Sequence, residues 1–569
     1  MNRLWLRSFV LMLGVVQLFA ASHFSLADDR VAEKMLPKDT LFFFSISSVP
    51  ELVKKWNKTS LGQMLQDPQL KPFLDDVSKK KEEWSKSVET DLGLSLDELL
   101  QLPQGELTIA FVEKPAQRVA LVAMLEYGSH QETVDKFLKK LDEELEKQET
   151  DHTTEVIEKI NVHIYKDKDP NSKDLVNTVT YFTDKSYLVL STELEAIKDV
   201  LDRWDGNSED TLAQNDQFQY IETQCKIEGG EPLVKLFLNP MGLIQTGIAI
   251  AQSSIPQIGM AGAFLPMLGF DGLKGYGGAM TFDEGDFEGI ANFFIYAENP
   301  KGLIGVFNFP AIQMSPPKWV PATVGSYLML NWNVLGAYTS IETLVDSFQG
   351  RGSTARLMEQ LADQGPMINP KKDIIDLLDG KIHFVQTESK EDSDSPQVPL
   401  MFLSLGLKDA NQMKKTLVNA AKSDDNNIET REFNGETIYE VSQPGSDTTL
   451  SMAVSEGNFV VTNDTSMLEG MMRGTVDQSS ALVDSDDYKK VAKFFPSKSS
   501  MLSFQRNDVQ FKMAYNLLKG SENDAIEGID FSKLPPFEAI AKYLLPSASY
   551  CVPDKKGAKT VSFTLRRSE

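Results

Sequence analysis

The sequence predicts an α+β fold made of two tandem related halves, each a largely antiparallel sheet with packed helices. Hairpins with alternating apolar and polar positions recur next to amphipathic helices. Several segments also recur in the same order about 270 residues further along the chain. We expect a signal peptide at 1–27, a first α+β repeat at 28–307, a proline-rich joint at 308–319 and a second α+β repeat at 320–569.

The N-terminus has the pattern of a secretory signal peptide. Arg3 and Arg7 precede an apolar run, and the small residues Ser25 and Ala27 precede acidic Asp28. We expect Sec-type export, cleavage after Ala27, and a periplasmic or extracellular protein. An uncleaved anchor would need about 20 continuous apolar residues, and polar residues interrupt this run.

Each half is predicted to contain the same elements in the same order. An apolar strand opens each half, at 42–44 and 327–330, and helices follow it. A pair of strands, an amphipathic helix, more strands and a capped helix come next, and each half closes on a hairpin, at 280–293 and 550–563. In the first half the amphipathic helix at 132–147 places Val134, Phe137, Leu138, Leu141 and Leu145 on one inward stripe.

Short motifs carry a resemblance to a known family. These are Leu36-Pro37 near the start of the mature chain, Asp67-Pro68, and the Pro-Lys-Trp-Val-Pro segment at 317–321. With the length of the chain, they resemble the exported bacterial proteins grouped as domain of unknown function 3352. That family is uncharacterised, so the resemblance implies location and architecture over nearly the whole mature chain, and no functional residue.

The net charge and the absence of known motifs exclude several classes of function. The 57 Lys and Arg residues against 82 Asp and Glu residues give a net charge of −25, which repels phosphate backbones, so no nucleic-acid partner is expected. The chain has no HExxH motif, paired CxxC motif or Walker loop, so we predict no catalytic residue, no cofactor and no metal. Cys225 and Cys551 have no cysteine at their counterpart positions, so we expect two unpaired thiols.

The histidines are interpreted through the repeat. His163 aligns with Thr437 and His383 aligns with Thr108, so both are interpreted as strand residues that fill space. His152 is placed in a polar connector, exposed to solvent.

Residues 236–270 contain no charged residue, whereas their counterpart at 507–545 contains many. We expect them to form a pair of helices buried in the core or between the halves, in which case Met260→Asp should unfold the protein. The alternative is an apolar surface for a lipid, another apolar ligand or a protein partner. Its candidate residues are Leu243, Ile244, Ile248, Ile250, Met260, Phe264 and Met267. Prolines interrupt the segment, so no stable membrane span is expected.

The sequence therefore favours an exported, non-catalytic binding or structural protein of the cell envelope. One alternative is a carrier of a lipid or another apolar ligand that uses residues 236–270. A further alternative is a hydrolase with scattered carboxylates, because paired acids cannot be identified among so many acidic residues without spatial information.

Overall fold

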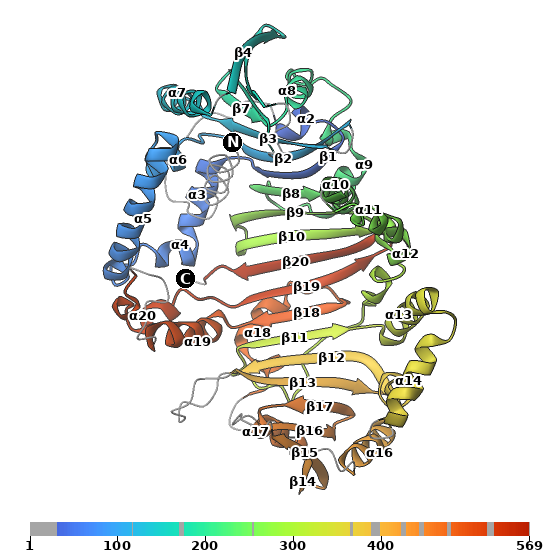
Figure 1. Cartoon of the computed structure of the whole chain (residues 1–569). Coiled ribbons are helices and arrows are strands. Elements are labelled where there is room, and N and C mark those ends of the chain that lie inside the picture. Colours follow the sequence, from blue (N-terminus) through green and yellow to red (C-terminus); the bar gives the residue numbers. More distant parts are fainter. Residues whose placement is uncertain are drawn as a thin grey trace.

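The computed structural model describes residues 31–567, apart from 116–117, 149, 170–175, 253–254, 365–367, 388–398, 423–427, 443–448, 475–479 and 521–528. The predicted signal peptide lies outside the described residues. The fold is α+β, as predicted, and consists of one large antiparallel sheet flanked by helices (Figure 1).

Twenty strands of the described residues form this sheet. The first ten are β1 (Thr40–Ile46), β2 (Leu107–Lys114), β3 (Arg118–Glu126), β4 (Thr150–Ile157), β5 (Ile160–Asp167), β6 (Thr178–Asp184), β7 (Tyr187–Ser191), β8 (Val234–Leu238), β9 (Leu273–Glu284) and β10 (Phe287–Ala297). The second ten are β11 (Ser326–Asn331), β12 (Leu378–Thr387), β13 (Leu400–Leu407), β14 (Ile428–Phe433), β15 (Glu436–Ser442), β16 (Thr449–Ser455), β17 (Asn458–Thr462), β18 (Met501–Gln505), β19 (Ser547–Asp554) and β20 (Gly557–Leu565).

The two sets of strands are paired in the same order. The first set runs β4-β5-β6-β7-β3-β2-β1-β8-β9-β10 across the sheet. The second runs β14-β15-β16-β17-β13-β12-β11-β18-β19-β20. A tandem duplication would produce this correspondence, and the common origin of the halves stays a prediction.

The halves are not separate sheets. The last strand of each closing hairpin, β10 and β20, pairs antiparallel, with Phe287 opposite Leu565 and Tyr296 opposite Gly557. This pairing satisfies the backbone groups that would otherwise form two bare sheet edges. As a result, one continuous sheet runs from β4 to β14 (Figure 1).

Helices of the first half are α2 (Ala32–Met35), α3 (Val49–Lys58), α4 (Ser60–Met64), α5 (Lys71–Leu92), α6 (Leu96–Gln101), α7 (Gln131–Lys147), α8 (Leu194–Leu201), α9 (Asp216–Gln224), α10 (Pro240–Gln252), α11 (Ile258–Ala261) and α12 (Leu265–Leu268). Those of the second half are α13 (Val334–Gln349), α14 (Ser353–Gln364), α15 (Pro370–Asp373), α16 (Ala410–Ala421), α17 (Thr465–Met472), α18 (Asp486–Ala492), α19 (Asn507–Gly520) and α20 (Phe537–Ala541). The predicted amphipathic helix is α7, in which Val134, Phe137 and Leu145 are buried.

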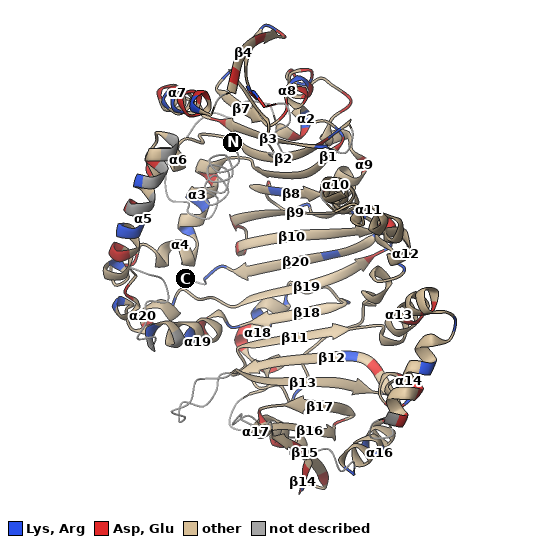
Figure 2. Cartoon of the chain, viewed as in Figure 1, with Lys and Arg blue, Asp and Glu red and all other residues tan. Residues whose placement is uncertain are grey.

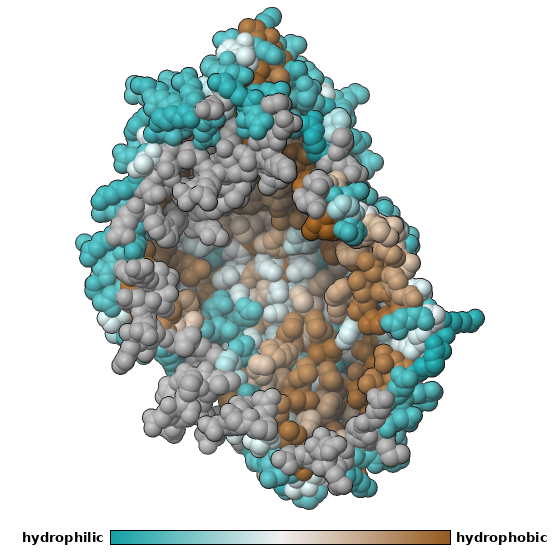
Figure 3. Space-filling view, viewed as in Figure 1, coloured by the Kyte–Doolittle hydropathy of each residue, from teal (hydrophilic) through white to brown (hydrophobic). Residues whose placement is uncertain are grey.

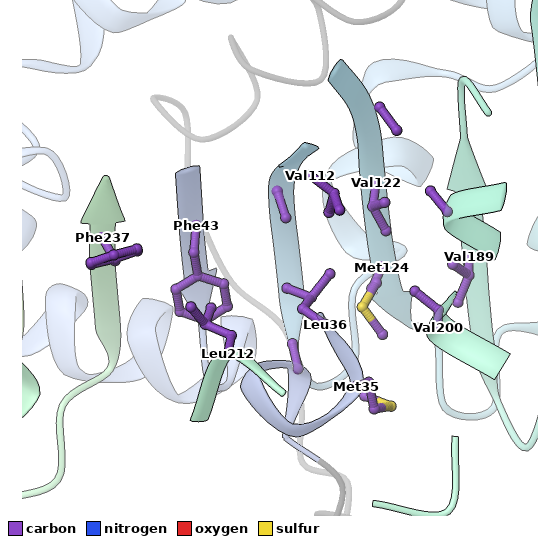
Figure 4. Close-up of a cluster of buried hydrophobic side chains, with 14 of the residues drawn as sticks. Met35, Leu36, Phe43, Val112, Val122, Met124, Val189, Val200, Leu212 and Phe237 are labelled. Atoms are coloured by element: carbon purple, nitrogen blue, oxygen red, sulfur yellow. The ribbon is translucent and has the colours of Figure 1, made fainter. Parts of the chain in front are cut away.

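One face of the sheet is covered by helices and carries two of the buried cores. In the first half, strand residues such as Phe43, Val122 and Phe237 pack with α2, α8 and α9 (Figure 4). In the second half, Phe504 and Phe563 pack in the same way with α17 and α18. Large apolar side chains at every second strand position supply this core, and the intervening positions point to the other face.

The other face, which we call the open face, is bare along the middle of the sheet. Two groups of helices stand along its sides (Figure 1). On one side α3, α4 and α5 of the first half stand beside α19 and α20 of the second half. On the opposite side α10, α11 and α12 of the first half stand near α13 and α14 of the second half. Figure 3 shows that the open face is hollowed between these walls.

Candidate functional site

The wall formed by α3–α5 and α19–α20, which we call the first wall, contains an apolar pocket on the open face with a volume of about 520 Å³. We call it the wall pocket. It is lined by Trp56, Thr59, Leu61, Met64, Phe282, Glu288, Gly289, Asn507, Gln510, Phe511, Ala514, Tyr543, Leu544, Leu545 and Thr564. Its size falls within the range of about 300–1,000 Å³ that is typical of small-molecule sites.

Local sequence explains how the first half contributes to this pocket. Ser48 accepts a hydrogen bond from the Glu51 amide and caps α3, whose buried face of Leu52 and Val53 fixes the helix on the sheet. Trp56, one turn later, packs edge to face against Phe282 of β9, with 5.3 Å between the ring centroids. The Trp56 ring is thereby held at the side of the pocket.

The carboxylate of Glu288 connects the pocket wall to the sheet. It accepts hydrogen bonds from the Ser60 amide at 2.9 Å and from the Ser60 hydroxyl at 2.6 Å. Ser60 is the first residue of α4, where an acidic side chain is favoured by the helix dipole. Glu288 therefore positions α4, and with it Leu61 and Met64 of the pocket.

Contacts between the halves close the outer side of the first wall. Leu70 packs with Tyr515, Ile540 and Leu544 in a buried apolar cluster. Asp67 accepts hydrogen bonds from Lys542 at 2.7 Å and from the Tyr543 hydroxyl at 2.8 Å.

These bonds stabilise the charged form of Asp67. The hydrogen bond from Lys542, with those from the Gln69 amide and Tyr543, lowers the pKa of Asp67 to about 2. Asp76 and Lys533 form a second ion pair across the same junction. The wall pocket thus lies between two helix groups that are fastened to each other.

The wall pocket opens onto a polar strip of the sheet. Strands β18, β19 and β20 alternate apolar residues, which enter the core, with hydroxyl residues on the open face. The half-buried hydroxyl residues are Ser503, Ser547, Ser549, Ser562 and Thr564, which we call the hydroxyl floor. They line a depression of about 350 Å³ that shares Gly289 and Thr564 with the wall pocket.

Strand register places these hydroxyls in rows. Ser503 lies opposite Ser549, and Ser549 lies opposite Ser562.

Cys551 follows Ser549 on the same face and is half-buried, whereas Cys225 is buried beneath the other face. Both thiols are free, as predicted. Burial raises the pKa of Cys225 to about 12.

The second wall, formed by α10–α14, contains most of the apolar segment at 236–270. Its start is buried as expected, because Phe237 of β8 lies in the core, but the structure contradicts the expected burial of the part from Ile250 onward. Met260 is 71% exposed, Ile255 51% and Ile250 47%. Phe264 and Met267 are also exposed, and α11 and α12 contain no buried residue. We call the exposed side chains of Ile250, Ile255, Met260, Phe264 and Met267 the apolar rim.

These side chains are exposed because the other half of the chain covers the helices of the second wall less than those of the first wall. Helices α19 and α20, the counterparts of this segment, bury Tyr515 and Ile540 against the first half. On the second wall the described contacts are slighter: Phe264 packs on Phe348 with 5.7 Å between ring centroids, and the Ser347 hydroxyl donates to Met267 Sδ at 3.5 Å. Phe348 is itself 52% exposed.

The structure brings some of the seven predicted apolar residues together and separates others. Ile250, Met260, Phe264 and Met267 are exposed, whereas Leu243, Ile244 and Ile248 are half-buried along α10. Sequence reasoning missed the wall pocket, because its residues come from segments distant in the sequence. The alternation of Ser and Thr with apolar residues in β18–β20 was a visible signal for the hydroxyl floor.

Three histidines, His152, His163 and His383, lie outside the residues that line the wall pocket and the hydroxyl floor. His163 and His383 lie in β5 and β12, as predicted, and His383 Nδ1 is 2.9 Å from the Tyr327 hydroxyl. His152 is exposed, as predicted, but it lies in strand β4 and not in a connector, and it stacks on Tyr165 at 4.2 Å between ring centroids. Within the described residues, no three His, Cys, Asp or Glu side chains gather closely enough to hold a metal ion.

A buried carboxylate lies beneath the covered face. Glu106 accepts hydrogen bonds from the Ser45 hydroxyl at 2.7 Å, the Thr108 hydroxyl at 3.1 Å and the Ala32 amide at 3.0 Å. Burial, reinforced by the negative charge of Glu33, raises the pKa of Glu106 to about 7 although these hydrogen bonds oppose the shift. Glu106 therefore connects helix α2 to strands β1 and β2.

Comparison with known proteins gives one match. Residues 316–525 match the family described as Protein of unknown function (DUF3352). The resemblance to this uncharacterised family is therefore confirmed for that part of the chain. No curated protein and no solved structure matches the chain.

Among the described residues, no helix is both long enough and apolar enough to span a bilayer.

Proposed function

We propose that this protein is an exported, non-catalytic binding protein for amphiphilic molecules with an alkyl chain. The alkyl chain occupies the wall pocket, and the polar part of the ligand lies on the hydroxyl floor. The observation that carries this proposal is the continuity of the two sites, which share Gly289 and Thr564. A concave apolar site with a few polar groups at one end is the usual form of a small-molecule site.

The chemistry of the two sites favours a ligand with an uncharged polar part. Trp56, Leu61, Met64 and Phe511 offer apolar surface for a chain. The hydroxyls can donate and accept hydrogen bonds but carry no charge. With a net charge of −25, the protein disfavours anionic ligands. Glycerol or sugar groups meet these requirements.

This proposal moves the ligand from the predicted segment at 236–270 to the opposite wall. The residues of the apolar rim are too exposed to enclose a small molecule. A purely structural role remains the second candidate, because the continuous sheet with paired halves would also suit a scaffold.

The first experiment is native mass spectrometry of the protein purified from its own host. Extra mass that dissociates as an amphiphile supports a carrier, and an empty protein supports the scaffold.

The second experiment measures displacement of a fluorescent monoacylglycerol in vitro. Ala514 lines the wall pocket on an exposed part of α19, so Ala514→Trp should fill the pocket without disturbing the core.

We expect Ala514→Trp to weaken monoacylglycerol binding by about tenfold or more, since the indole replaces ligand contacts. Lys139→Trp, at an exposed position of α7, is the matched control and should bind like the wild type. Unchanged binding in Ala514→Trp, with an unchanged melting temperature, would place the ligand elsewhere and refute the assignment of the pocket.

A further inference from the structure

The apolar rim belongs to a long segment without a charged residue. Residues 236–270 contain no Lys, Arg, Asp or Glu, in a chain with a net charge of −25. Figure 2 shows α10, α11 and α12 without a charged residue, whereas α5, α7 and α14 carry both signs. The rim lies at the outer ends of the strands, beside the hollow of the open face (Figure 3).

The rim side chains also project from the surface. Met260 of the short helix α11 is 71% exposed, and Ile255, in the connection between α10 and α11, is 51% exposed. Isolated exposed apolar side chains are common, but a contiguous exposed set on one segment indicates an interaction site. Phe348 of α13 extends this set, because it packs on Phe264 and is itself exposed.

We propose that the apolar rim docks on the surface of a lipid bilayer and inserts shallowly, without a membrane span. Apolar side chains on interfacial helices bury themselves at the boundary between headgroups and acyl chains. Most of the acidic surface of this protein would be repelled by anionic lipids, whereas the rim side chains themselves bring no charge to a bilayer. Shallow insertion leaves the backbone ends of these short helices at the hydrated headgroup level.

Charge and shape favour a bilayer over a second copy of the chain. Two copies that each carry a net charge of −25 repel one another, whereas a zwitterionic bilayer surface has no net charge. A protruding side chain such as Met260 needs a matching cavity in a protein partner, but fluid lipid accommodates it. Because the rim lacks Lys and Arg, its binding should depend little on ionic strength.

The test uses the full mature protein and phosphatidylcholine vesicles in a flotation assay. Wild-type protein should float with the vesicles at both low and high salt. The triple variant Ile255→Ser, Met260→Ser, Phe264→Ser should lose binding by about tenfold or more, because its apolar transfer area is removed. The matched control is Val156→Ser on β4, since Val156 is 70% exposed but lies at the far end of the sheet.

Each result supports or overturns the proposal. Flotation of the wild type and the control, with loss in a triple variant whose melting temperature is unchanged, supports bilayer docking. Equal flotation of the triple variant and the wild type overturns it. A wild-type dimer that stays off the vesicles and becomes monomeric in the triple variant overturns it in favour of a second copy. Ala514→Trp should float normally, so failure of the pocket assignment would not be mistaken for failure of docking.

Discussion

Met260→Asp distinguishes a buried from an exposed apolar segment, and the structure predicts that the variant stays folded. Full burial of a Met side chain is worth about 1.5–3 kcal/mol. Because Met260 is 71% exposed, the substitution forfeits less than a third of that burial, at most about 1 kcal/mol. The aspartate remains solvated, so no cost of burying a charge is added.

Met124→Asp provides the matched comparison. Met124 is 1% exposed and lies in the core between β3 and the helices of the covered face (Figure 4). The same substitution there loses the full apolar burial and places a carboxylate in the interior, for a cost of about 4 kcal/mol or more. That is a large fraction of the roughly 5–15 kcal/mol by which proteins are stabilised.

The assay is chemical denaturation of both variants, followed by circular dichroism, with size-exclusion chromatography to establish the monomer. We expect the denaturation midpoint of Met260→Asp to stay close to that of the wild type and that of Met124→Asp to fall steeply. If Met260→Asp unfolds or aggregates as Met124→Asp does, then the segment is buried in solution and both the exposure argument and the docking proposal are refuted.

Three further predictions concern ionisable groups. The contribution of Glu106, whose folded pKa of about 7 exceeds an unfolded value of about 4.3, is fully present below about pH 4.3 and is lost as pH rises through 7. Between pH 5 and pH 8 the wild type should therefore lose about 2.5 kcal/mol of its free energy of unfolding through Glu106. Chemical denaturation at the two pH values should show that Glu106→Gln lacks this loss, and parallel pH profiles of the two proteins would contradict the prediction. The depressed pKa of Asp67 works in the opposite sense, so its ion pair with Lys542 stabilises above about pH 3.9 and is lost as pH falls through about 2. Asp67→Asn should lower the denaturation midpoint at pH 7 and reduce the loss on acidification, whereas an unchanged midpoint would show that this contact does not stabilise the wall. Alkylation of the native protein with peptide mapping should modify Cys551 and spare Cys225, and equal labelling would contradict their placement.

Elements with a clear local pattern were predictable from the sequence. The stripe of α7 and the closing hairpins β9–β10 and β19–β20 follow from the spacing of apolar residues, which reflects a single buried face. Strand β4 was missed at His152 because both faces of this edge strand are largely exposed, so its residues show no alternation.

The sequence by itself determined that residues 236–270 are apolar and uncharged, and that β18–β20 alternate hydroxyl with apolar residues. Only the tertiary structure decided which apolar segments are covered. Helices α19 and α20 are covered because α4 and α5, from the other half, lie against them, whereas α11 and α12 contain no buried residue. Burial depends on neighbours brought together by the β10–β20 pairing, and a local sequence pattern contains no information about such distant partners.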